Sequence, residues 1–586
     1  MFEAEQKTIE NQIRAYCTHN GLPEPSLQWN PIPFSGQWGI TTSFFQLAAQ
    51  EGRLGKKVIV PIRAQELADA VRTYLGKPAG FERIEAVKGY LNLYYSTAEY
   101  ARRVLNTVFE RGEDYGRGEL KGETVMVEFS QPNTHKTFHV GHLRNVITGS
   151  VVANLLEFAG HTVVRANYIG DIGLHVMKWM WEYLKYHDGE QPVGDVQRWM
   201  GDIYTEADRH FVDEPGFEQE VRALFARWDR HDPDLIELWK RTRAWSLEGF
   251  GQIYTALGVR FDRLYFESEE EDAGKELVDG LIERKIAEDE RPDGPVIIRL
   301  DELLGSKDEK YRVLVILRSD GTSLYSTKDL ALAIKKFKEY PLSRSIYVID
   351  VRQSLYMQQI FKTLELMGCE WAKNLYHLAY EIVNLPGNVT MSSRDGTVVL
   401  LDDLMREATQ RALEIVQQKN PDLPAETQQT VARAVGLGAI KYPMLSRDNT
   451  KITTFDWDAA LDFNGQAAPY IQYAHVRANS ILRRMAGELP EDAVLPAEFE
   501  PSEVALVDLI SRLPREVQRA ALTYRPLDIA TLAYDLARAF NDFYNQCPVL
   551  QAEPEIRAFR LRLVAAARQA IANSLALLGI TAPEAM

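Results

Sequence analysis

The sequence has few cysteines: Cys17, Cys369 and Cys547 are the three among its 586 residues. They lie far apart and form no C-x-x-C pair, so the sequence predicts neither a disulfide framework nor a cysteine-bound zinc site. The first ten residues, MFEAEQKTIE, are acidic and lack an apolar stretch, which argues against a secretory signal. We therefore expect a cytoplasmic protein without a protein-bound structural metal.

Long apolar runs and an excess of positive charge are also missing. No stretch approaches the ~20 uninterrupted apolar residues of a membrane-spanning helix, so we expect no membrane partner. Lysine and arginine number 67 against 83 aspartate and glutamate, a net charge of −16. This balance excludes a basic protein that coats nucleic acid through bulk charge, although a local basic patch on an acidic body can still bind RNA.

The composition is otherwise that of a globular protein, with 45% hydrophobic and 26% charged residues. Its length predicts about three to four domains. In residues 1–118, helical stretches at 5–16 and 64–74 alternate with strand-like stretches at 57–60 and 90–95, which predicts a small α+β domain. The turn-rich residues 111–122 predict a linker after it.

Residues 119–425 have the pattern of a parallel sheet covered by helices. A strand begins at Glu123 (ETVMVEFS), and a second one follows at 162–169 (TVVRANYI). Between them a helical period ends at Gly160, where a helix C′ glycine belongs; its apolar positions are Leu143, Ile147, Val151, Leu155 and Phe158. Strand, helix and strand form a βαβ unit, and residues 345–350 (SIYVID) predict another buried strand. We interpret the polar residues 180–300 as insertions into this domain.

From about residue 426 to 586 the pattern is helical almost throughout, which predicts a bundle with its own core. Prolines are expected to mark the joints between helices, near Pro443, Pro490, Pro514, Pro526 and Pro548.

Polar residues are densest where the first strand of the sheet passes into its helix, in EFSQPNTHKTFHVGH (128–142). Ligands of parallel sheets bind at the carboxyl ends of the strands, and a helix N-terminus attracts anions. His139, His142 and Lys136 can donate to phosphate oxygens, and Gly141 lets a nucleotide approach the backbone. A second interpretation is a pair of helix-capping histidines beside a packing glycine.

H-V-G-H resembles the HIGH signature of class I aminoacyl-tRNA synthetases, and the longer string EFSQPNTHKTFHVGHLRN is similar to its version in the arginyl-tRNA synthetase family. Segments resembling the same family follow in order along nearly the whole chain, with the weakest resemblance at 180–300. They are LYSTKDLALA (324–333), PGNVTMSSRDGTVVLLDDL (386–404), APYIQYAHVRANSILRR (468–484), LARAFNDFYNQCPVL (536–550) and LLGITAPEAM (577–586).

The resemblance implies a Rossmann-like α/β catalytic domain at 119–425, an N-terminal α+β domain at 1–118 that binds the tRNA D-loop, and an all-α anticodon-binding domain at 426–586. It implies an arginine–tRNA ligase that acts as a monomer. Its substrates would be L-arginine, ATP with Mg²⁺ and tRNA(Arg). Arginine would attack the ATP α-phosphate, and the tRNA terminal ribose would then attack the adenylate. Such chemistry needs positioning and charge stabilisation more than a protein nucleophile.

The second signature of the class departs from its pattern. K-M-S-K-S is replaced here by T-M-S-S-R at 390–394, so both lysines are absent. The resemblance implies that Lys136 substitutes for them, with Arg394 sharing the role; an ordinary Ser/Asp/Gly turn is the alternative. The implied catalytic residues are Lys136, His139, His142 and Arg394, and the implied ATP-binding residues are His139, Gly141, His142, Met391, Ser392 and Ser393.

For arginine, the resemblance implies two carboxylates, Glu128 and Asp329, with Tyr325 lining the pocket. Forked hydrogen bonds from a planar guanidinium to carboxylates distinguish arginine from lysine. Asn133 and Gln353 would hold the amino and carboxylate end. The alternatives are a helix N-terminal acid for Asp329 and a surface carboxylate at a strand end for Glu128.

For tRNA, the implied residues are Tyr90, Asn92, Tyr470, Tyr473, Arg477, Tyr544 and Met586. Aromatic side chains followed by an arginine can stack on unpaired bases. At this helical spacing, Tyr470 and Tyr473 alone are more typical of a helix core, and Tyr90 and Asn92 of a strand.

Two other functions compete with this interpretation. A cysteinyl-type class I synthetase would need Cys and His ligands for zinc, against which the scattered cysteines argue. A synthetase-derived RNA-binding or regulatory protein that has lost catalysis is favoured by the missing lysines, and is opposed by the intact H-V-G-H, Asn133, Lys136 and Asp329.

Overall fold

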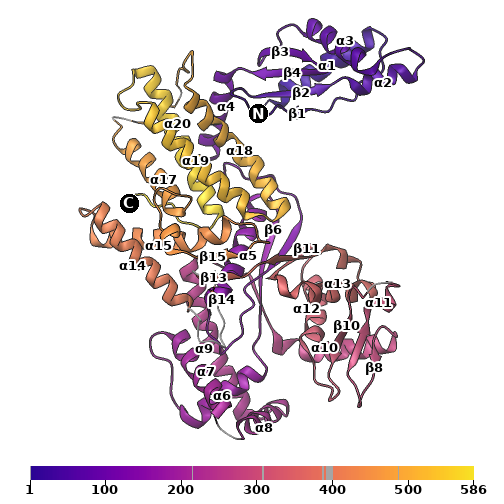
Figure 1. The fold of residues 1–586 in the computed structure, drawn as a ribbon, viewed down its shortest axis with the longest axis vertical. Helices are drawn as coiled ribbons and strands as arrows, with labels where there is room; N and C mark the ends of the chain where they lie inside the picture. Colours follow the sequence, from indigo (N-terminus) through magenta and orange to yellow (C-terminus); the bar gives the residue numbers. More distant parts are fainter. Residues whose placement is uncertain are drawn as a thin grey trace. The chain divides into compact units, whose positions relative to one another are not determined.

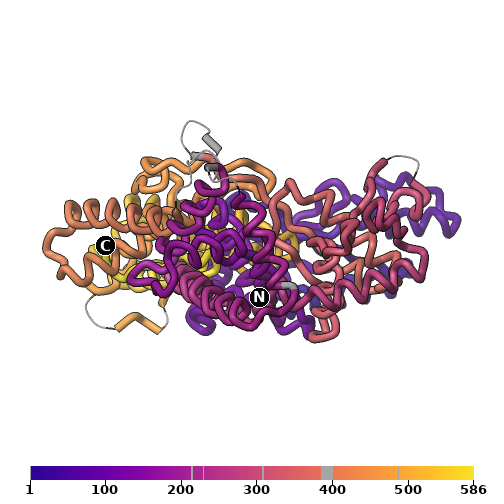
Figure 2. Tube along the Cα trace, turned by 90° about the horizontal axis from the view of Figure 1, so that it is seen from below, coloured from indigo at the N-terminus to yellow at the C-terminus, as the bar shows by residue number. Residues whose placement is uncertain are grey.

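The structure is a computed structural model. It describes residues 2–213, 216–306, 309–385, 389–390, 400–485, 488–491 and 493–586. The chain forms two compact units, each of which draws on several stretches of sequence. One unit comprises Met1–Tyr115, Arg477–Leu513 and Asp535–Asn573, and the other comprises Gly116–Val476, Pro514–Tyr534 and Ser574–Met586. In Figures 1 and 2 the colours run along the sequence from indigo at the N-terminus to yellow at the C-terminus, so each stretch can be found by its residue numbers.

The N-terminal stretch of the first unit is a small α+β fold, as predicted. Its sheet has the order β1-β2-β4-β3 with antiparallel neighbours. Its elements are α1 (Glu3–His19), β1 (Asn30–Pro31), β2 (Gly39–Ser43), α2 (Phe45–Arg53), α3 (Val60–Leu75), β3 (Phe81–Val87), β4 (Tyr90–Tyr95), α4 (Thr97–Arg111) and the 3₁₀ turn η1 (Gly112–Asp114).

The prediction of a strand at 57–60 is wrong, because helix α3 begins at Val60. Pro61 stands in the first turn of this helix, where a missing N–H costs nothing and the fixed φ favours the helix. The apolar run before Pro61 is therefore the entry to a helix.

A five-stranded parallel sheet with the order β12-β11-β5-β6-β7 is the centre of the second unit. Its strands are β5 (Thr124–Glu128), β6 (Thr162–Ile169), β7 (Arg263–Phe266), β11 (Leu342–Asp350) and β12 (Leu375–Tyr380). The chain proceeds outward from β5 through β6 to β7, and later returns to the other side of β5 as β11. The carboxyl ends of β5 and β11 therefore form a topological switch point, where ligands bind in open parallel sheets.

Helix α5 (Val140–Phe158) connects β5 to β6, which confirms the predicted βαβ unit. Its apolar side chains are buried on nearly all sides, as expected of a helix between a sheet and other helices. Gly160 follows its C-cap with φ +102°, and a Cβ at this position would lie 1.9 Å from the carbonyl oxygen of Glu119. Glycine is therefore required there.

Two insertions separate the strands. The first, between β6 and β7, is a helical bundle of α6 (Leu174–Tyr186), α7 (Val196–Asp213), α8 (Phe217–Asp229) and α9 (Pro233–Leu257). The second, between β7 and β11, carries a small antiparallel sheet. It contains η2 (Glu267–Glu269), α10 (Glu271–Glu283), β8 (Glu288–Asp289), β9 (Val296–Arg299), α11 (Leu300–Leu303), β10 (Val313–Leu317) and α12 (Tyr325–Glu339). After β11 come η3 (Val351–Gln353), α13 (Ser354–Leu366) and η4 (Glu370–Asn374).

The C-terminal part of the chain is helical, as predicted (Figure 1). Its helices are α14 (Leu401–Lys419), α15 (Ala425–Leu445), α16 (Trp457–Ala460), α17 (Ala468–Arg483), α18 (Pro501–Thr523), α19 (Pro526–Gln546) and α20 (Pro554–Leu577). Among the described helices, none combines the length and the apolar character needed to cross a membrane.

Two of the five prolines expected at joints lie inside helices instead: Pro443 in α15 and Pro514 in α18. A proline inside a helix leaves the carbonyl four residues earlier without its N–H donor. For Pro514 this carbonyl belongs to Ile510, and the buried Tyr115 hydroxyl donates to it at 3.0 Å. The tyrosine supplies the missing hydrogen bond, so α18 continues through the proline.

Arg144, in the body of α5, fastens this helix to a second small sheet of β13 (Val383–Leu385), β14 (Val389–Thr390) and β15 (Thr453–Thr454). Its guanidinium is buried and donates to carbonyl oxygens of the residues that flank β13 and β15. These are Glu381 at 2.6 Å, Ile382 at 3.4 Å, Asp448 at 3.2 Å and Lys451 at 2.8 Å. Burial lowers the pKa of Arg144 to about 10, so it stays charged at neutral pH.

Replacement of Arg144 by methionine should therefore destabilise the protein by ~3 kcal/mol or more, because several buried carbonyls lose a charged donor. The matched control is Arg222→Met, which removes an exposed pair with Glu218 on α8 and should change stability by no more than ~0.5 kcal/mol. Urea unfolding of both variants measures the difference. Equal effects would contradict the anchoring role of Arg144.

Candidate active site

A cavity of about 430 Å³ opens at the carboxyl ends of β5 and β11. The sheet, the loop after β5, α12 and α13 supply its walls. Four residues of α12, at intervals of three and four positions, present one face of the helix to it: Tyr325, Asp329, Leu332 and Lys336. The other lining residues are Glu128, Gln131, Asn133, Tyr168, Gly170, Glu267, Tyr347, Ile349, Gln353, Tyr356, Met357 and Ile360.

All five residues expected to bind arginine line this cavity: Glu128, Asn133, Tyr325, Asp329 and Gln353. Strand β5, the loop after it, helix α12 and the turn η3 supply them, so residues more than 200 positions apart in the sequence converge. Tyr325 is 59% exposed and lies at the rim. Asn133 pairs with Gly170 as an isolated bridge, and a Cβ at Gly170 would lie 2.3 Å from the Asn133 Oδ1. Their assignment to arginine itself stays a prediction.

Glu128 is not a surface carboxylate, since it is buried and forms an ion pair with Lys336, whose side chain is fully buried. Burial lowers the pKa of Lys336, but the adjacent Glu128 carboxylate, together with Tyr347 and Asp329, outweighs burial and raises it. The second oxygen of Glu128 accepts from the Gln131 amide at 3.2 Å. The Glu128 carboxylate is therefore held on both sides.

Among the residues that the structure describes, none forms an ion pair with Asp329, although the nearby Lys336 ammonium lowers its pKa. Its carboxylate accepts a hydrogen bond from the Tyr356 hydroxyl. Burial raises its pKa to about 7, while the Tyr356 hydrogen bond lowers it and the Glu128 carboxylate raises it. A cation bound beside this buried acid would favour its ionised form.

A third acid, Glu267, lies on the same cavity and pairs with Lys328 of α12 at 2.9 Å. Burial raises its pKa, and the Lys328 ammonium lowers it. Three carboxylates, Glu128, Glu267 and Asp329, therefore line the cavity with one ammonium group, that of Lys336. Lys328, which pairs with Glu267, lies outside the lining and is also 3.8 Å from Glu271. This excess of acid suits an organic cation.

Beside this cavity, α5 begins with the two predicted histidines. His139 is the N-cap, and its Nδ1 accepts from the Gly141 N–H at 3.1 Å. The Nδ1 of His142 accepts from the His139 N–H at 3.2 Å. The capping interpretation is therefore correct for both residues, which does not exclude a role with ATP.

The two caps fix the tautomer, since a ring nitrogen that accepts cannot carry the proton. Each imidazole then has its proton on Nε2 and can donate from there. Burial, with a smaller effect of Lys136, lowers the pKa of His139 to about 4 and that of His142 well below its usual range. Both are neutral donors at pH 7. A Cβ at residue 141 would lie 2.7 Å from the His139 ring, so Gly141 keeps that ring in place.

Lys136 lies between these histidines and the first insertion. Its Nζ is 5.4 Å from the ring centre of Tyr204 on α7. Burial lowers its pKa, the Asp208 carboxylate raises it, and the Lys178 ammonium lowers it. Of the second signature, Met391, Ser392, Ser393 and Arg394 lie outside the described residues, so their predicted contacts with ATP stay a prediction.

The residues predicted to bind tRNA are found in both units. Tyr90 (45% exposed) and Asn92 lie on β4, and Tyr544 on α19 is 43% exposed, with the Arg477 guanidinium 4.9 Å from its ring centre. Tyr470 packs against Tyr534 at 5.4 Å. Tyr473 and Met586 join one apolar cluster, and Asn420 donates to the Met586 carbonyl. Half-buried tyrosines of this kind combine packing with an accessible face.

The sequence interpretation missed Glu267, Lys336 and Tyr356. Lys336 carries a signal, because it lies seven positions after Asp329 and therefore on the same face of α12. Tyr356 follows Gln353 by one turn. Glu267 carries none, because it follows a short strand in the region that was assigned to insertions.

A parallel sheet, an H-V-G-H helix at its switch point and an acidic cavity at its strand ends are typical of a class I aminoacyl-tRNA synthetase. Comparison with known proteins agrees: residues 105–457 match the family described as tRNA synthetases class I (R), catalytic domain, and residues 471–586 match the DALR anticodon binding domain. The chain belongs to the arginyl-tRNA synthetase family.

Individual relatives span nearly the whole chain. It is 34% identical over 526 residues to an arginine–tRNA ligase of Clostridium botulinum, covering 89% of this chain and 90% of that protein. It is 36% identical over 514 residues to one of Chloroflexus aggregans, covering 86% and 87%. The solved Thermus thermophilus arginyl-tRNA synthetase has a TM-score of 0.77 at 29% identity, over 99% of this chain and all of that one.

We expect opposite effects on stability when each of two carboxylates of the cavity, Asp329 and Glu128, is replaced by its neutral amide. Asp329 has a folded pKa of about 7, above its ordinary 3.8, so its contribution to stability falls as pH rises from about 4 to 7. Asp329→Asn should therefore raise the melting temperature at pH 8 and have little effect near pH 4. Glu128→Gln should lower it, because Lys336 would keep a buried, unpaired charge.

Melting curves of both variants at the two pH values provide the measurement. A loss of stability in Asp329→Asn at pH 8, equal to that of Glu128→Gln, would contradict the description of Asp329 as an uncompensated acid.

Proposed function

We propose that this protein joins L-arginine to tRNA(Arg) in two steps, an ATP-dependent activation to arginyl-adenylate and a transfer to the 3′ end of the tRNA. The observation that carries the proposal is a cavity whose lining has more carboxylates than ammonium groups, together with a helix N-terminus that has two neutral histidines. The first suits a guanidinium, and the second suits phosphate oxygens. Family membership points to the same reaction.

In this proposal Asp329 and the Glu128–Lys336 pair recognise the side chain of arginine. A guanidinium can fork between carboxylate oxygens and stack on Tyr347 or Tyr168 of the cavity wall. A lysine would leave buried acceptors without donors, which a site of this kind rejects strongly. The enzyme then needs no separate editing domain.

Asn133 and Gln353 hold the amino and carboxylate groups, so the carboxylate faces the N-terminus of α5. Here the Nε2–H groups of His139 and His142 can donate to phosphate oxygens on which charge increases in the transition state. Lys136 adds the positive charge that the degenerate second signature lacks. ATP would be bound as its Mg²⁺ complex. The resemblance implies that Met391, Ser392, Ser393 and Arg394, which lie outside the described residues, also contact it.

We further propose that residues 1–118 contact the tRNA D-loop through Tyr90 and Asn92. Residues 426–586 would bind the anticodon through Tyr470, Tyr473, Arg477, Tyr544 and the C-terminal Met586, with residues 119–425 as the catalytic domain. Stacking on exposed tyrosine faces suits unpaired bases. We also propose that the enzyme is cytoplasmic and acts as a monomer.

Charging of bulk tRNA with each labelled amino acid in turn tests the function. Arginine alone should be incorporated, in an ATP-dependent reaction, and lysine should be rejected by a factor on the order of 10⁴ in kcat/KM. Charging with a different amino acid would overturn the substrate. Binding of tRNA without charging of any would favour a regulatory protein that has lost catalysis.

Lys136→Ala should lower kcat by ~10²–10³, equivalent to ~3–4 kcal/mol, with little change in arginine binding, because a cation near the pyrophosphate acts mainly in the transition state. Single-turnover charging with saturating ATP and tRNA measures it. Lys362→Ala, on the far side of α13 and paired with Glu365, is the control. A near-normal rate in Lys136→Ala would shift the role to Arg394, whose replacement by alanine is otherwise expected to cost less.

A further inference from the structure

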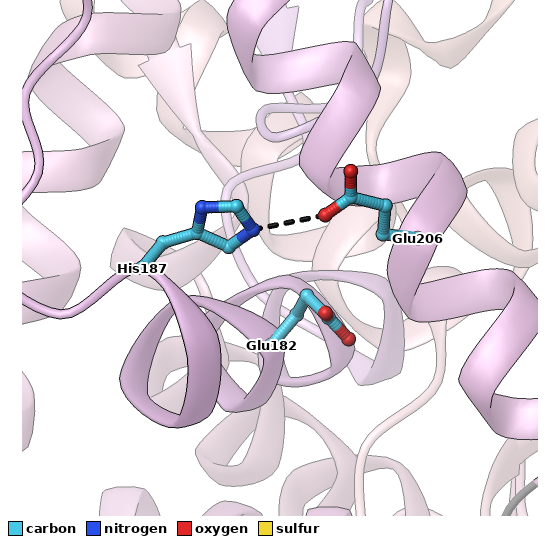
Figure 3. Close-up of side chains that lie close together, drawn as sticks. All are labelled: Glu182, His187 and Glu206. Carbon is cyan, nitrogen blue, oxygen red and sulfur yellow. Dashed lines mark hydrogen bonds and ion pairs between the residues drawn. The ribbon is translucent and has the colours of Figure 1, made fainter.

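A cluster of acidic and histidine side chains lies in the first insertion, outside the proposed active site. Glu182 belongs to α6, His187 is the C-cap of that helix, and Glu206 lies on α7. One ligand atom of each residue lies within 4.8 Å of the others (Figure 3). We propose that these three residues bind a divalent transition-metal ion, of which Zn²⁺ is the representative.

Glu182 is the strongest sign of a ligand. Its side chain is fully buried, and its Oε1 has no hydrogen-bond partner within the part of the chain that the structure describes. A buried carboxylate oxygen without a donor costs several kcal/mol unless a cation completes it. In Figure 3 this carboxylate lies below the contact between His187 and Glu206. A metal between the three groups would satisfy it.

The surroundings of the three residues resemble a second coordination shell. Nδ1 of His187 lies 3.0 Å from the Glu190 carboxylate, while Nε2 is 2.9 Å from Glu206. Nδ1 of His210 is 2.7 Å from the other oxygen of Glu182. A metal-binding histidine commonly donates its second N–H to a carboxylate, which orients the ring. Glu190 has this position for His187, and His210 orients Glu182.

The donor set determines the class of metal. One imidazole and two carboxylates suit Zn²⁺ and neighbouring first-row ions, and a water can complete four-coordination. Mg²⁺ and Ca²⁺ prefer sets made of oxygen alone. When the metal binds, Nε2 gives up its proton to solvent and its contact with Glu206 is replaced by two metal–ligand bonds. Glu190 (53% exposed) and Glu206 (42%) leave a path from solvent.

The ion would fasten the end of α6 to the middle of α7. This matters for the neighbouring site, because α7 also packs against the segment that carries Lys136. A Cβ at Gly201 would lie 2.0 Å from the Thr137 side chain, and Tyr204, two residues before Glu206, lies beneath the Lys136 ammonium. The metal would therefore stiffen one wall behind this lysine. The alternative is a network of ion pairs around a protonated His187.

Calorimetric titration of the metal-free full chain with Zn²⁺, without ATP, tests the proposal, and Mg²⁺ and Ca²⁺ are titrated in parallel. We expect one saturable Zn²⁺ site, a rise in melting temperature on binding, and no comparable effect of the other two ions. His187→Gln and Glu206→Gln should each abolish this site, and Glu190→Gln should weaken it ~10–100-fold. Two variants at the site keep the test valid if one of them fails to fold.

The matched controls are Glu218→Gln on α8 and His19→Gln on α1, which remove a similar exposed group elsewhere and should leave binding unchanged. No saturable Zn²⁺ binding would overturn the proposal and support the ion-pair network. Equal Zn²⁺ affinity of the wild type, His187→Gln and Glu206→Gln would also overturn it, because the ion would then bind at another place.

Discussion

The buried ion pair between Glu128 and Lys336 is the interaction on which the proposed active site depends. It joins the last residue of the central strand β5 to the last turn of α12, and therefore fixes the helix against the sheet. Because the pair is neutral as a whole, Asp329 beside it becomes the acid that a substrate cation must neutralise. Without Lys336, both Glu128 and Asp329 would lack a neighbouring ammonium group.

Helix α5 is the second constraint, because its N-terminus and its body each hold a part of the proposed active site in place. Its N-terminus presents the two capped histidines, while Asn145 in its body accepts from the Ser130 N–H at 2.6 Å and donates to the Val348 carbonyl at 2.8 Å. Arg144, next to Asn145, fastens the helix to the β13–β15 sheet. One helix thus holds the loop after β5, strand β11 and the segment that precedes the second signature.

The sequence predicted the parallel sheet, the βαβ unit and the helical C-terminal part, because hydrophobic periodicity and the glycine at residue 160 are local signals. It also named Glu128, Asn133 and Asp329. It missed the partners of these residues, Lys336 and Tyr356. The helical spacing can place Lys336 on the same face as Asp329, but it cannot show that Lys336 pairs with Glu128, 208 positions away, or that Tyr356 donates to Asp329. The prolines show the same limit: Pro514 was expected at a joint, but a distant tyrosine supplies the lost hydrogen bond. The histidine and glutamates of the proposed metal site likewise come together only when α6 and α7 pack.

The central claim is that a guanidinium neutralises Asp329 in the cavity. Arginine should bind best to the ionised carboxylate, so binding at pH 6.5, below the pKa of about 7, should release a fraction of a proton. Calorimetry of arginine binding in buffers of different ionisation enthalpy measures this release directly. We expect proton release in the wild type and none in Asp329→Asn. Arginine binding without proton release in the wild type, or with equal release in the variant, would contradict it.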